Sequence, residues 1–142
     1  MKYCEALWKL EWRCPFCEIN DDLKIYDYAS AYMTIAMAPY WADHLLIIPK
    51  RHVDSIFDLT IEEHDEMQWL IRAWIKMLRK KWHHNYSIVV REWEWVWKSV
   101  KHIHYHILPD IELKALWIDW DRKFLSNEEW KNIISELSVF KV

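Results

Sequence analysis

Residues 102–107 read His-Ile-His-Tyr-His-Ile, and this alternation constrains the fold more than any other feature of the chain. In a β-strand, successive side chains point to opposite faces, so His102, His104 and His106 share one face and the apolar residues between them share the other. Neighbouring imidazoles on that face lie about 6.6–7 Å apart along the strand, too far for a direct bond but close enough to serve one substrate, or a metal and a substrate. We therefore predict a strand over 101–108 with a histidine face and an apolar face.

The rest of the chain predicts an α+β domain with an antiparallel sheet. Four further apolar or β-branched runs predict strands, over 23–28, 32–36, 44–48 and 86–90. Two capping boxes each open an amphipathic helix, Thr60 with Glu63 and Ser126 with Glu129, and these helices are expected to run to about residues 81 and 137.

Composition limits the classes of protein to which this chain can belong. Its 142 residues predict one domain over 1–142, and a hydrophobic fraction of 53% with 29% charged residues argues against disorder. A net charge of −3 gives no overall attraction to nucleic acid or to an anionic membrane, and no segment resembles a signal peptide or a membrane span. We expect a cytoplasmic protein whose partners include neither nucleic acid nor membrane.

The motif CPFC places Cys14 and Cys17 at a spacing typical of half a zinc site or of a redox pair. A thioredoxin-like redox pair would open a helix in a βαβ unit, whereas the strands that follow here are expected to be antiparallel. Zinc would need two further ligands, for which His52 and His102 are candidates in a Cys2His2 set. The alternative is a pair of reduced core cysteines. The odd third cysteine, Cys4, has no partner at metal-ligand spacing and is expected to be inert.

In chain order, the segments CPFC, HLLIIPKRHV and SVKHIHYHILP resemble the histidine-triad family of nucleotide hydrolases and transferases. The resemblance covers about residues 13 to 110, and the alternating histidines followed by two apolar residues are its most specific part. It implies a five-stranded antiparallel sheet with one long central helix and a C-terminal helix, usually in a homodimer. It also implies a phosphohydrolase or nucleotidyltransferase for small nucleotides, either dinucleoside polyphosphates or nucleoside phosphoramidates.

The resemblance further implies roles for individual residues. His104 would attack the α-phosphate and form a covalent nucleotidyl-histidine, which divides one difficult displacement into two easier ones. It must be neutral to attack, so its other ring nitrogen should donate to a carbonyl. His106 and Ser99 would bond to non-bridging phosphate oxygens, and His44 would belong to the hydrogen-bond network around them. A structural zinc ion would be held by Cys14, Cys17, His52 and His102.

Several positions depart from the family pattern. Ala36 replaces the acidic or amide residue that would accept the ribose hydroxyls, and Asp43 replaces the glycine before His44. Arg91 and Lys98 add positive charge beside the expected phosphate site, where we expect them to help bind an anionic substrate. Elsewhere the basic run 79–81 is interpreted as the solvated last turn of a helix, with an anion site as the alternative. His64, His83 and His84 are interpreted as surface residues.

The chain contains no glycine, where average usage would give roughly ten, and it contains 12 tryptophans. Trp93 and Trp97 stand where the family has glycines before the serine, and Trp117 and Trp120 lie in an expected loop. UGA codons that mean glycine but were translated as tryptophan would explain this in part, although ordinary glycine codons should leave some glycine. A glycine-free engineered variant, or a tryptophan platform that stacks on bases or sugars, is the alternative. Tryptophans that fill the phosphate loop would instead favour a zinc-stabilised nucleotide-binding protein without turnover.

Overall fold

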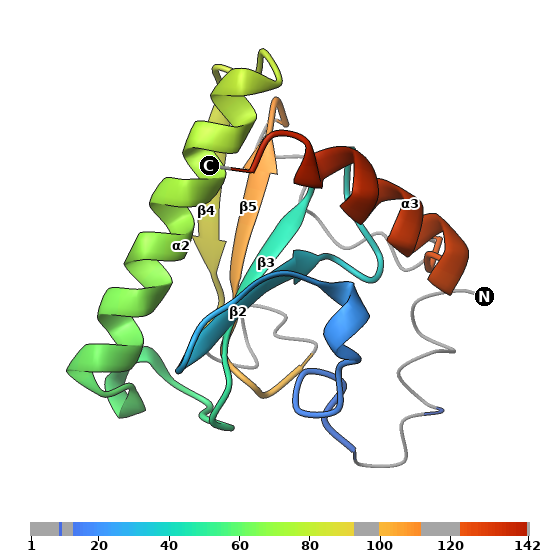
Figure 1. The fold of residues 1–142 in the computed structure, drawn as a ribbon. Coiled ribbons are helices and arrows are strands. Elements are labelled where there is room, and N and C mark those ends of the chain that lie inside the picture. Colours follow the sequence, from blue (N-terminus) through green and yellow to red (C-terminus); the bar gives the residue numbers. More distant parts are fainter. Residues whose placement is uncertain (1–8, 10–12, 93–99, 112–122, 142) are drawn as a thin grey trace.

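The computed structural model describes residues 9, 13–92, 100–111 and 123–141, and in these ranges one antiparallel sheet is covered by two α-helices (Figure 1). This arrangement confirms the predicted α+β class, whereas the extent of the domain over 1–142 stays a prediction. The elements follow in the order η1 (Asp21–Leu23), β1 (Lys24–Asp27), β2 (Ala31–Ile35), β3 (Leu45–Pro49), η2 (Ile56–Asp58), α2 (Ile61–Lys80), β4 (Tyr86–Val90), β5 (Tyr105–Pro109) and α3 (Asn127–Ser138).

The five strands lie in the order β1-β2-β3-β5-β4, and each neighbouring pair is antiparallel. Strand β4 therefore lies at the edge of the sheet, and β5, which follows it in the chain, lies between β4 and β3. There Leu46 stands opposite His106 and Ile47 opposite Tyr105, so β3 runs alongside the histidine segment, residues 102–107. No helix in the described ranges has both the length and the apolar character needed to cross a membrane.

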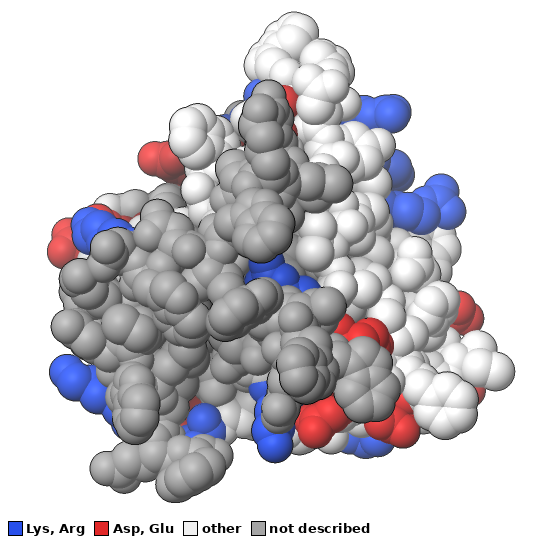
Figure 2. Space-filling view, turned by 180° about the vertical axis from the view of Figure 1, so that it is seen from behind, with Lys and Arg blue, Asp and Glu red and all other residues white. Residues whose placement is uncertain are grey.

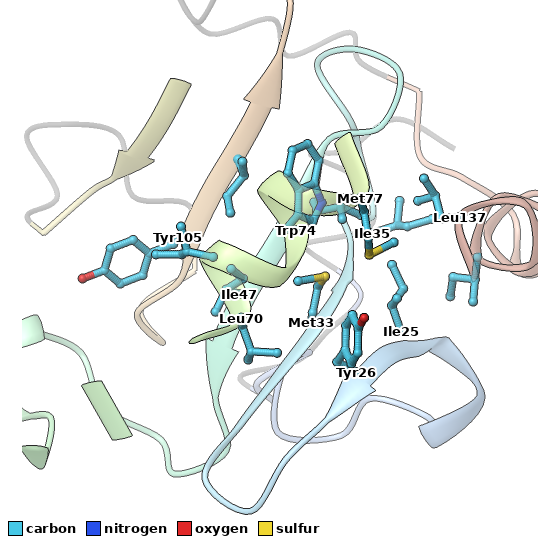
Figure 3. Close-up of a cluster of buried hydrophobic side chains, with 14 of the residues drawn as sticks. Ile25, Tyr26, Met33, Ile35, Ile47, Leu70, Trp74, Met77, Tyr105 and Leu137 are labelled. Carbon is cyan, nitrogen blue, oxygen red and sulfur yellow. The ribbon is translucent and has the colours of Figure 1, made fainter. Parts of the chain in front are cut away.

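The main core lies between α2, α3 and one face of the sheet (Figure 3). Both predicted capping boxes are present, since the Thr60 and Ser126 side chains accept from the backbone N–H groups of Glu63 and Glu129. From these starts each helix turns an apolar stripe toward the strands, and Trp74 in α2 is almost fully buried. Residues that share this core include Met33, Ile35, Ile47, Leu70, Trp74, Met77, Tyr105, Ile107 and Leu137.

The opposite face of the sheet carries the second, smaller cluster of apolar side chains. Because side chains alternate along β3, Leu45 and Ile47 enter the main core while His44 and Leu46 face the other way. The same alternation in β5 turns Tyr105 toward the helices and His106 away from them. The histidines therefore lie on the face that the two helices leave uncovered.

The predicted strand over 101–108 is wrong at its start, because β5 begins only at Tyr105. The residues before Tyr105 are held instead by hydrogen bonds to the end of β3 and to the loop that follows it. The N–H of Ile103 donates to the Val53 carbonyl at 2.7 Å, and Nε2 of His102 lies 2.8 Å from the Pro49 carbonyl oxygen. His102 is therefore positioned by the end of β3 and Ile103 by the loop after it, whereas His106 lies in the strand ladder.

Three described residues other than glycine adopt left-handed backbone conformations: Asp43 (φ 60°), Trp82 (φ 69°) and Asp110 (φ 53°). Aspartate tolerates this region better than most residues, whereas tryptophan has no such advantage. Trp82 directly follows the C-cap of α2, where its N–H donates to Arg79 O at 3.2 Å and the N–H of His83 donates to Leu78 O at 3.0 Å. These two bonds define a Schellman motif, whose left-handed position is usually glycine.

We expect Trp82→Gly to raise the free energy of unfolding by about 1 kcal/mol, since glycine removes the steric cost of the left-handed conformation. The Trp82 side chain is 85% exposed, so little packing is lost with it. Urea denaturation followed by circular dichroism would measure the change. Trp69→Gly is the matched control: Trp69 is exposed in the middle of α2, and glycine there should destabilise by about 1 kcal/mol. Destabilisation by both substitutions would contradict the prediction.

Candidate functional site

Four side chains from three separate segments converge beside the histidine segment. One ligand atom from each of Cys14, Cys17, His52 and His102 lies within 4.8 Å of the others. Nδ1 of His102 is 3.4 Å from Sγ of Cys14 and 3.5 Å from Sγ of Cys17, and Nδ1 of His52 is 3.3 Å from Sγ of Cys17. Tetrahedral zinc with ordinary Zn–S and Zn–N bonds separates such ligand atoms by about 3.3–3.8 Å. The four predicted ligands therefore form a group that could hold a metal ion.

Contacts behind the two histidines orient them for this task. Nε2 of His102 bonds to the Pro49 carbonyl oxygen, which can only accept, so Nε2 carries the proton and Nδ1 presents its lone pair to the thiols. Nε2 of His52 lies 3.3 Å from a carboxylate oxygen of Asp54. Backing of this kind, by a carbonyl or a carboxylate, is typical of metal-bound imidazoles.

The CPFC turn is attached to the sheet through its central phenylalanine. Phe16 is buried, and its carbonyl accepts a 2.7 Å hydrogen bond from the Tyr32 hydroxyl. Its ring meets the rings of His102 and His104 edge-on, with centroids 5.9 Å and 4.9 Å away. Burial, together with the hydrogen bond from Cys14, raises the pKa of the Cys17 thiol to about 11. A bound cation would instead favour the thiolate that serves as a metal ligand.

His104 lies next to this group and is 5% exposed. Its Nδ1 is 2.8 Å from the carbonyl oxygen of His102, so Nδ1 carries the proton and Nε2 keeps its lone pair. This carbonyl is the kind of partner that the family resemblance implies for His104. A neutral imidazole with its tautomer fixed in this way can act as a nucleophile or as a base at Nε2.

His106 belongs to a short relay of hydrogen bonds that starts at a backbone amide. The N–H of Tyr40 donates to Nδ1 of His44 at 3.1 Å, and Nε2 of His44 is 3.0 Å from Nδ1 of His106. Because a backbone N–H can only donate, neutral rings along the relay place a proton on Nε2 of His44 and then on Nε2 of His106. His104 and His106, whose ring centroids are 4.7 Å apart, therefore offer a lone pair and a donor side by side.

Arg91 is connected to this relay through Tyr40, a residue that the sequence did not single out. Nη2 of Arg91 donates to the Tyr40 hydroxyl at 3.2 Å, and the guanidinium lies 5.8 Å from the ring centroid. The Tyr40 ring stacks on His44 with centroids 5.5 Å apart. The one feature of the sequence that could have identified Tyr40 as a site residue is its position four residues before His44. An isolated tyrosine at that spacing forms no recognisable motif.

The remaining predicted site residues fall outside the described ranges. They are Ser99 and Lys98, together with the tryptophans at 93, 97, 117 and 120, and Cys4 lies outside as well.

The interpretation of His83 as a surface residue is wrong, and that of Lys81 as part of a solvated turn is wrong too. The His83 side chain is 21% exposed and its two ring nitrogens contact Asp43 and Asp110, while Lys81 Nζ lies 2.7 Å from Asp43.

On the view of the molecule from behind, the described basic and acidic side chains are interspersed (Figure 2).

Comparison with known proteins finds both the sequence family and the fold. The family model described as HIT domain matches residues 18–113. Adenosine 5'-monophosphoramidase hnt1 of Schizosaccharomyces pombe is 28% identical over 130 residues, which is 88% of this chain and 96% of that protein.

Two solved structures share the fold across most of both chains. A zinc-bound histidine triad family protein from Mycobacterium smegmatis aligns with a TM-score of 0.67 and 20% identity, over 89% of this chain and 94% of its own. The diadenosine triphosphate hydrolase of Plasmodium falciparum aligns with a TM-score of 0.68 and 21% identity, over 99% and 95%. The histidine segment, the sheet that carries it and the match over residues 18–113 agree, and the chain belongs to the HIT domain family.

Proposed function

We propose that this protein is a nucleotide phosphohydrolase or nucleotidyltransferase that acts on dinucleoside polyphosphates or nucleoside phosphoramidates through a covalent intermediate. The observation that carries the proposal is the hydrogen bond from Nδ1 of His104 to the His102 carbonyl, because it leaves a lone pair on Nε2 at a site lined by histidines. Two similar proteins are named as a monophosphoramidase and a diadenosine triphosphate hydrolase, and these activities support the proposed substrate class.

In the proposed reaction, Nε2 of His104 attacks the α-phosphorus. A phosphorus–nitrogen bond forms to His104, and the bond from phosphorus to the leaving group breaks. Water then cleaves the nucleotidyl-histidine, so that a nucleoside monophosphate is released and His104 is restored. The leaving oxygen or nitrogen ends with one proton more and the attacking water with one proton fewer. The relay from Tyr40 through His44 keeps a proton on Nε2 of His106, which donates to a non-bridging oxygen as charge develops at phosphorus.

Other residues would bind the substrate. Ser99 is proposed to donate to the same phosphate oxygens, and Lys98 and Arg91 to supply positive charge toward the anionic chain. The Arg91 guanidinium is held over the Tyr40 ring, next to His44, which suits this role.

We propose that Cys14, Cys17, His52 and His102 hold one structural zinc ion. Bound zinc would join the CPFC turn, the loop after β3 and the histidine segment by four coordinate bonds, and it would take no part in the chemistry at phosphorus. A homodimer over the single domain 1–142 and a cytoplasmic location complete the proposal.

A panel of substrates tests the reaction class directly. Purified protein should release nucleoside monophosphate from an adenosine phosphoramidate or from a diadenosine polyphosphate. Chromatography of the reaction mixture would detect this product. Binding of these compounds without any release of product would contradict turnover, and would favour the zinc-stabilised nucleotide-binding protein.

We expect His106→Ala to lower kcat by roughly 10²–10³-fold, the usual loss when one charge-stabilising donor is removed. Its metal content should equal that of the wild type, because His106 lies outside the group of metal ligands. Steady-state assays with metal analysis on the same preparation measure both quantities. A variant with unchanged kcat would show that His106 does not serve the transition state.

A further inference from the structure

Four charged side chains from distant parts of the chain meet around Asp43, the residue that directly precedes His44. Asp43 precedes β3, Lys81 and His83 follow α2, and Asp110 follows β5; we call these residues the Asp43 cluster. The two carboxylate oxygens of Asp43 lie 2.7 Å from Nζ of Lys81 and 2.9 Å from Nε2 of His83. Nδ1 of His83 contacts Oδ2 of Asp110. Three chain connections are thereby tied together at one end of the sheet.

The geometry requires that His83 is charged. Both of its ring nitrogens face carboxylate oxygens, which only accept, and an imidazole donates from both nitrogens only when it is protonated. Partial burial lowers the pKa of His83, but the hydrogen bonds to Asp110 and Asp43 outweigh it and raise the pKa overall. The hydrogen bond from His83 in turn lowers the pKa of Asp110. With His83 protonated, the two carboxylates are balanced by two cations.

The cluster acts on a backbone position that needs support. Asp43 has φ 60°, in the left-handed region, which aspartate tolerates better than most residues when its side chain is held by local hydrogen bonds. Its carboxylate is buried, with the side chain 6% exposed, so it must be paired in the folded protein. Lys81 and His83 supply this pairing, and with it they hold the left-handed turn that directs the next residue, His44, toward His106.

We propose that the Asp43 cluster is a positioning unit, in which Lys81 and His83 fix Asp43 so that His44 keeps its hydrogen bond to His106. None of the four residues touches the reacting atoms in this account; they act through His44. The inference rests on the proposed function for its effect on rate, but the arrangement of the imidazoles can be measured without any substrate.

The positioning depends on pH, with a sign that follows from His83. A group whose pKa is raised in the folded state contributes stability below its unfolded value, about 6.5, and loses that contribution as the pH rises through the folded value. When His83 loses its proton, one of its two carboxylate contacts becomes a repulsion between lone pairs. Among the described residues that contact it, only Asp43 and Asp110 are charged, and Lys81 reaches it through Asp43. We therefore expect the positioning of Asp43 to be lost at alkaline pH, where His83 is deprotonated.

The test compares two substitutions at His83 with one at its exposed neighbour. His83→Gln carries no charge, and both of its donors lie on one nitrogen, so it cannot replace the two opposed N–H groups of the imidazolium. We therefore expect kcat to fall by roughly 10-fold near neutral pH with KM little changed, since a misplacement of about 1 Å in a catalytic site can cost as much as 10²-fold. His83→Arg keeps a permanent charge with donors on several nitrogens, so it should restore kcat and remove the alkaline loss. His84→Gln, at an exposed position, should behave as the wild type.

Nitrogen chemical shifts of the imidazoles provide the readout that is independent of substrate. In the wild type at pH 6, His44 should show the Nε2–H tautomer, and His83 should titrate later than an exposed histidine. In His83→Gln, the shifts of His44 and His106 should change, while those in His84→Gln should not. If no nucleotide is turned over, the proposed function fails but these spectra still decide the positioning. Unchanged shifts of His44 and His106 in His83→Gln, or equal kcat at every pH in an active enzyme, would overturn it.

Discussion

His104→Ala should abolish turnover while the fold and the metal group stay intact. The substitution removes the one imidazole whose Nδ1 is committed to a carbonyl and whose Nε2 keeps its lone pair beside His106. Loss of a covalent nucleophile lowers kcat by roughly 10⁴–10⁶-fold in well-studied enzymes. No metal ligand is lost, because the group of four does not contain His104. The melting temperature and the metal content should therefore remain near those of the wild type.

A trapping experiment separates the nucleophile from a residue that only assists. Nucleotide labelled at the α-phosphate, mixed with wild-type protein and quenched quickly in the cold, should leave label on the chain through the phosphorus–nitrogen bond. His106→Ala should still accumulate label, but more slowly, whereas His104→Ala should accumulate none. Label recovered on His104→Ala, or full activity in that variant, would identify a different nucleophile.

The parts of the fold that rest on local patterns could be predicted from the sequence. The pairs Thr60 with Glu63 and Ser126 with Glu129 place the starts of both helices correctly, since each capping box is made within four residues. Strand β4 is predicted at its observed bounds, Tyr86–Val90. The group of four side chains that could hold a metal ion could be predicted because thiols at this spacing, together with histidines, carry a recognisable chemistry.

Features made by contacts between distant segments could not be predicted in this way. Alternation alone suggested that the strand begins before His102, but bonds from Ile103 to Val53 and from His102 to Pro49 hold that segment as a loop. His83 and Lys81 form ordinary hydrophilic sequence after a helix. Their role depends on Asp43, about 40 positions earlier in the chain, and on the sheet order that brings both together.

The backbone also shows how a chain without glycine makes its turns. Asp43 and Asp110 adopt left-handed conformations and use their carboxylates to bind His83, so the side chains contribute what glycine would not. Trp82 adopts the same conformation at a helix end and its side chain is exposed. A glycine would suit position 82 on steric grounds, as the hypothesis of a miscoded UGA codon requires, whereas the carboxylates at positions 43 and 110 make contacts that glycine could not make.

If the group of four binds a metal ion, we expect removal of that ion to lower the stability of the protein more than a substitution at an exposed position would. If Cys14, Cys17, His52 and His102 bind zinc, the metal joins three segments that are distant in sequence, and its binding free energy adds directly to that of folding. His102→Ala removes a ligand and leaves the Pro49 carbonyl without its buried donor. A combined loss of about 3 kcal/mol or more follows from these two effects, which corresponds to a fall of roughly 10 °C in Tm.

A chelator separates the two effects of this substitution. The wild type should carry about one zinc ion per chain and lose Tm when the ion is removed, whereas His102→Ala should lack the ion and respond little to chelation, because its site is already broken. His64→Ala, at an exposed position on α2, is the matched control and should keep both the ion and the response. Wild-type protein without bound metal, or with a Tm that chelation does not change, would show that the four side chains are held together by their hydrogen bonds alone. In that case His102 would stabilise the fold through Pro49, and the loss in His102→Ala would fall to the 1–3 kcal/mol expected for one unsatisfied buried carbonyl.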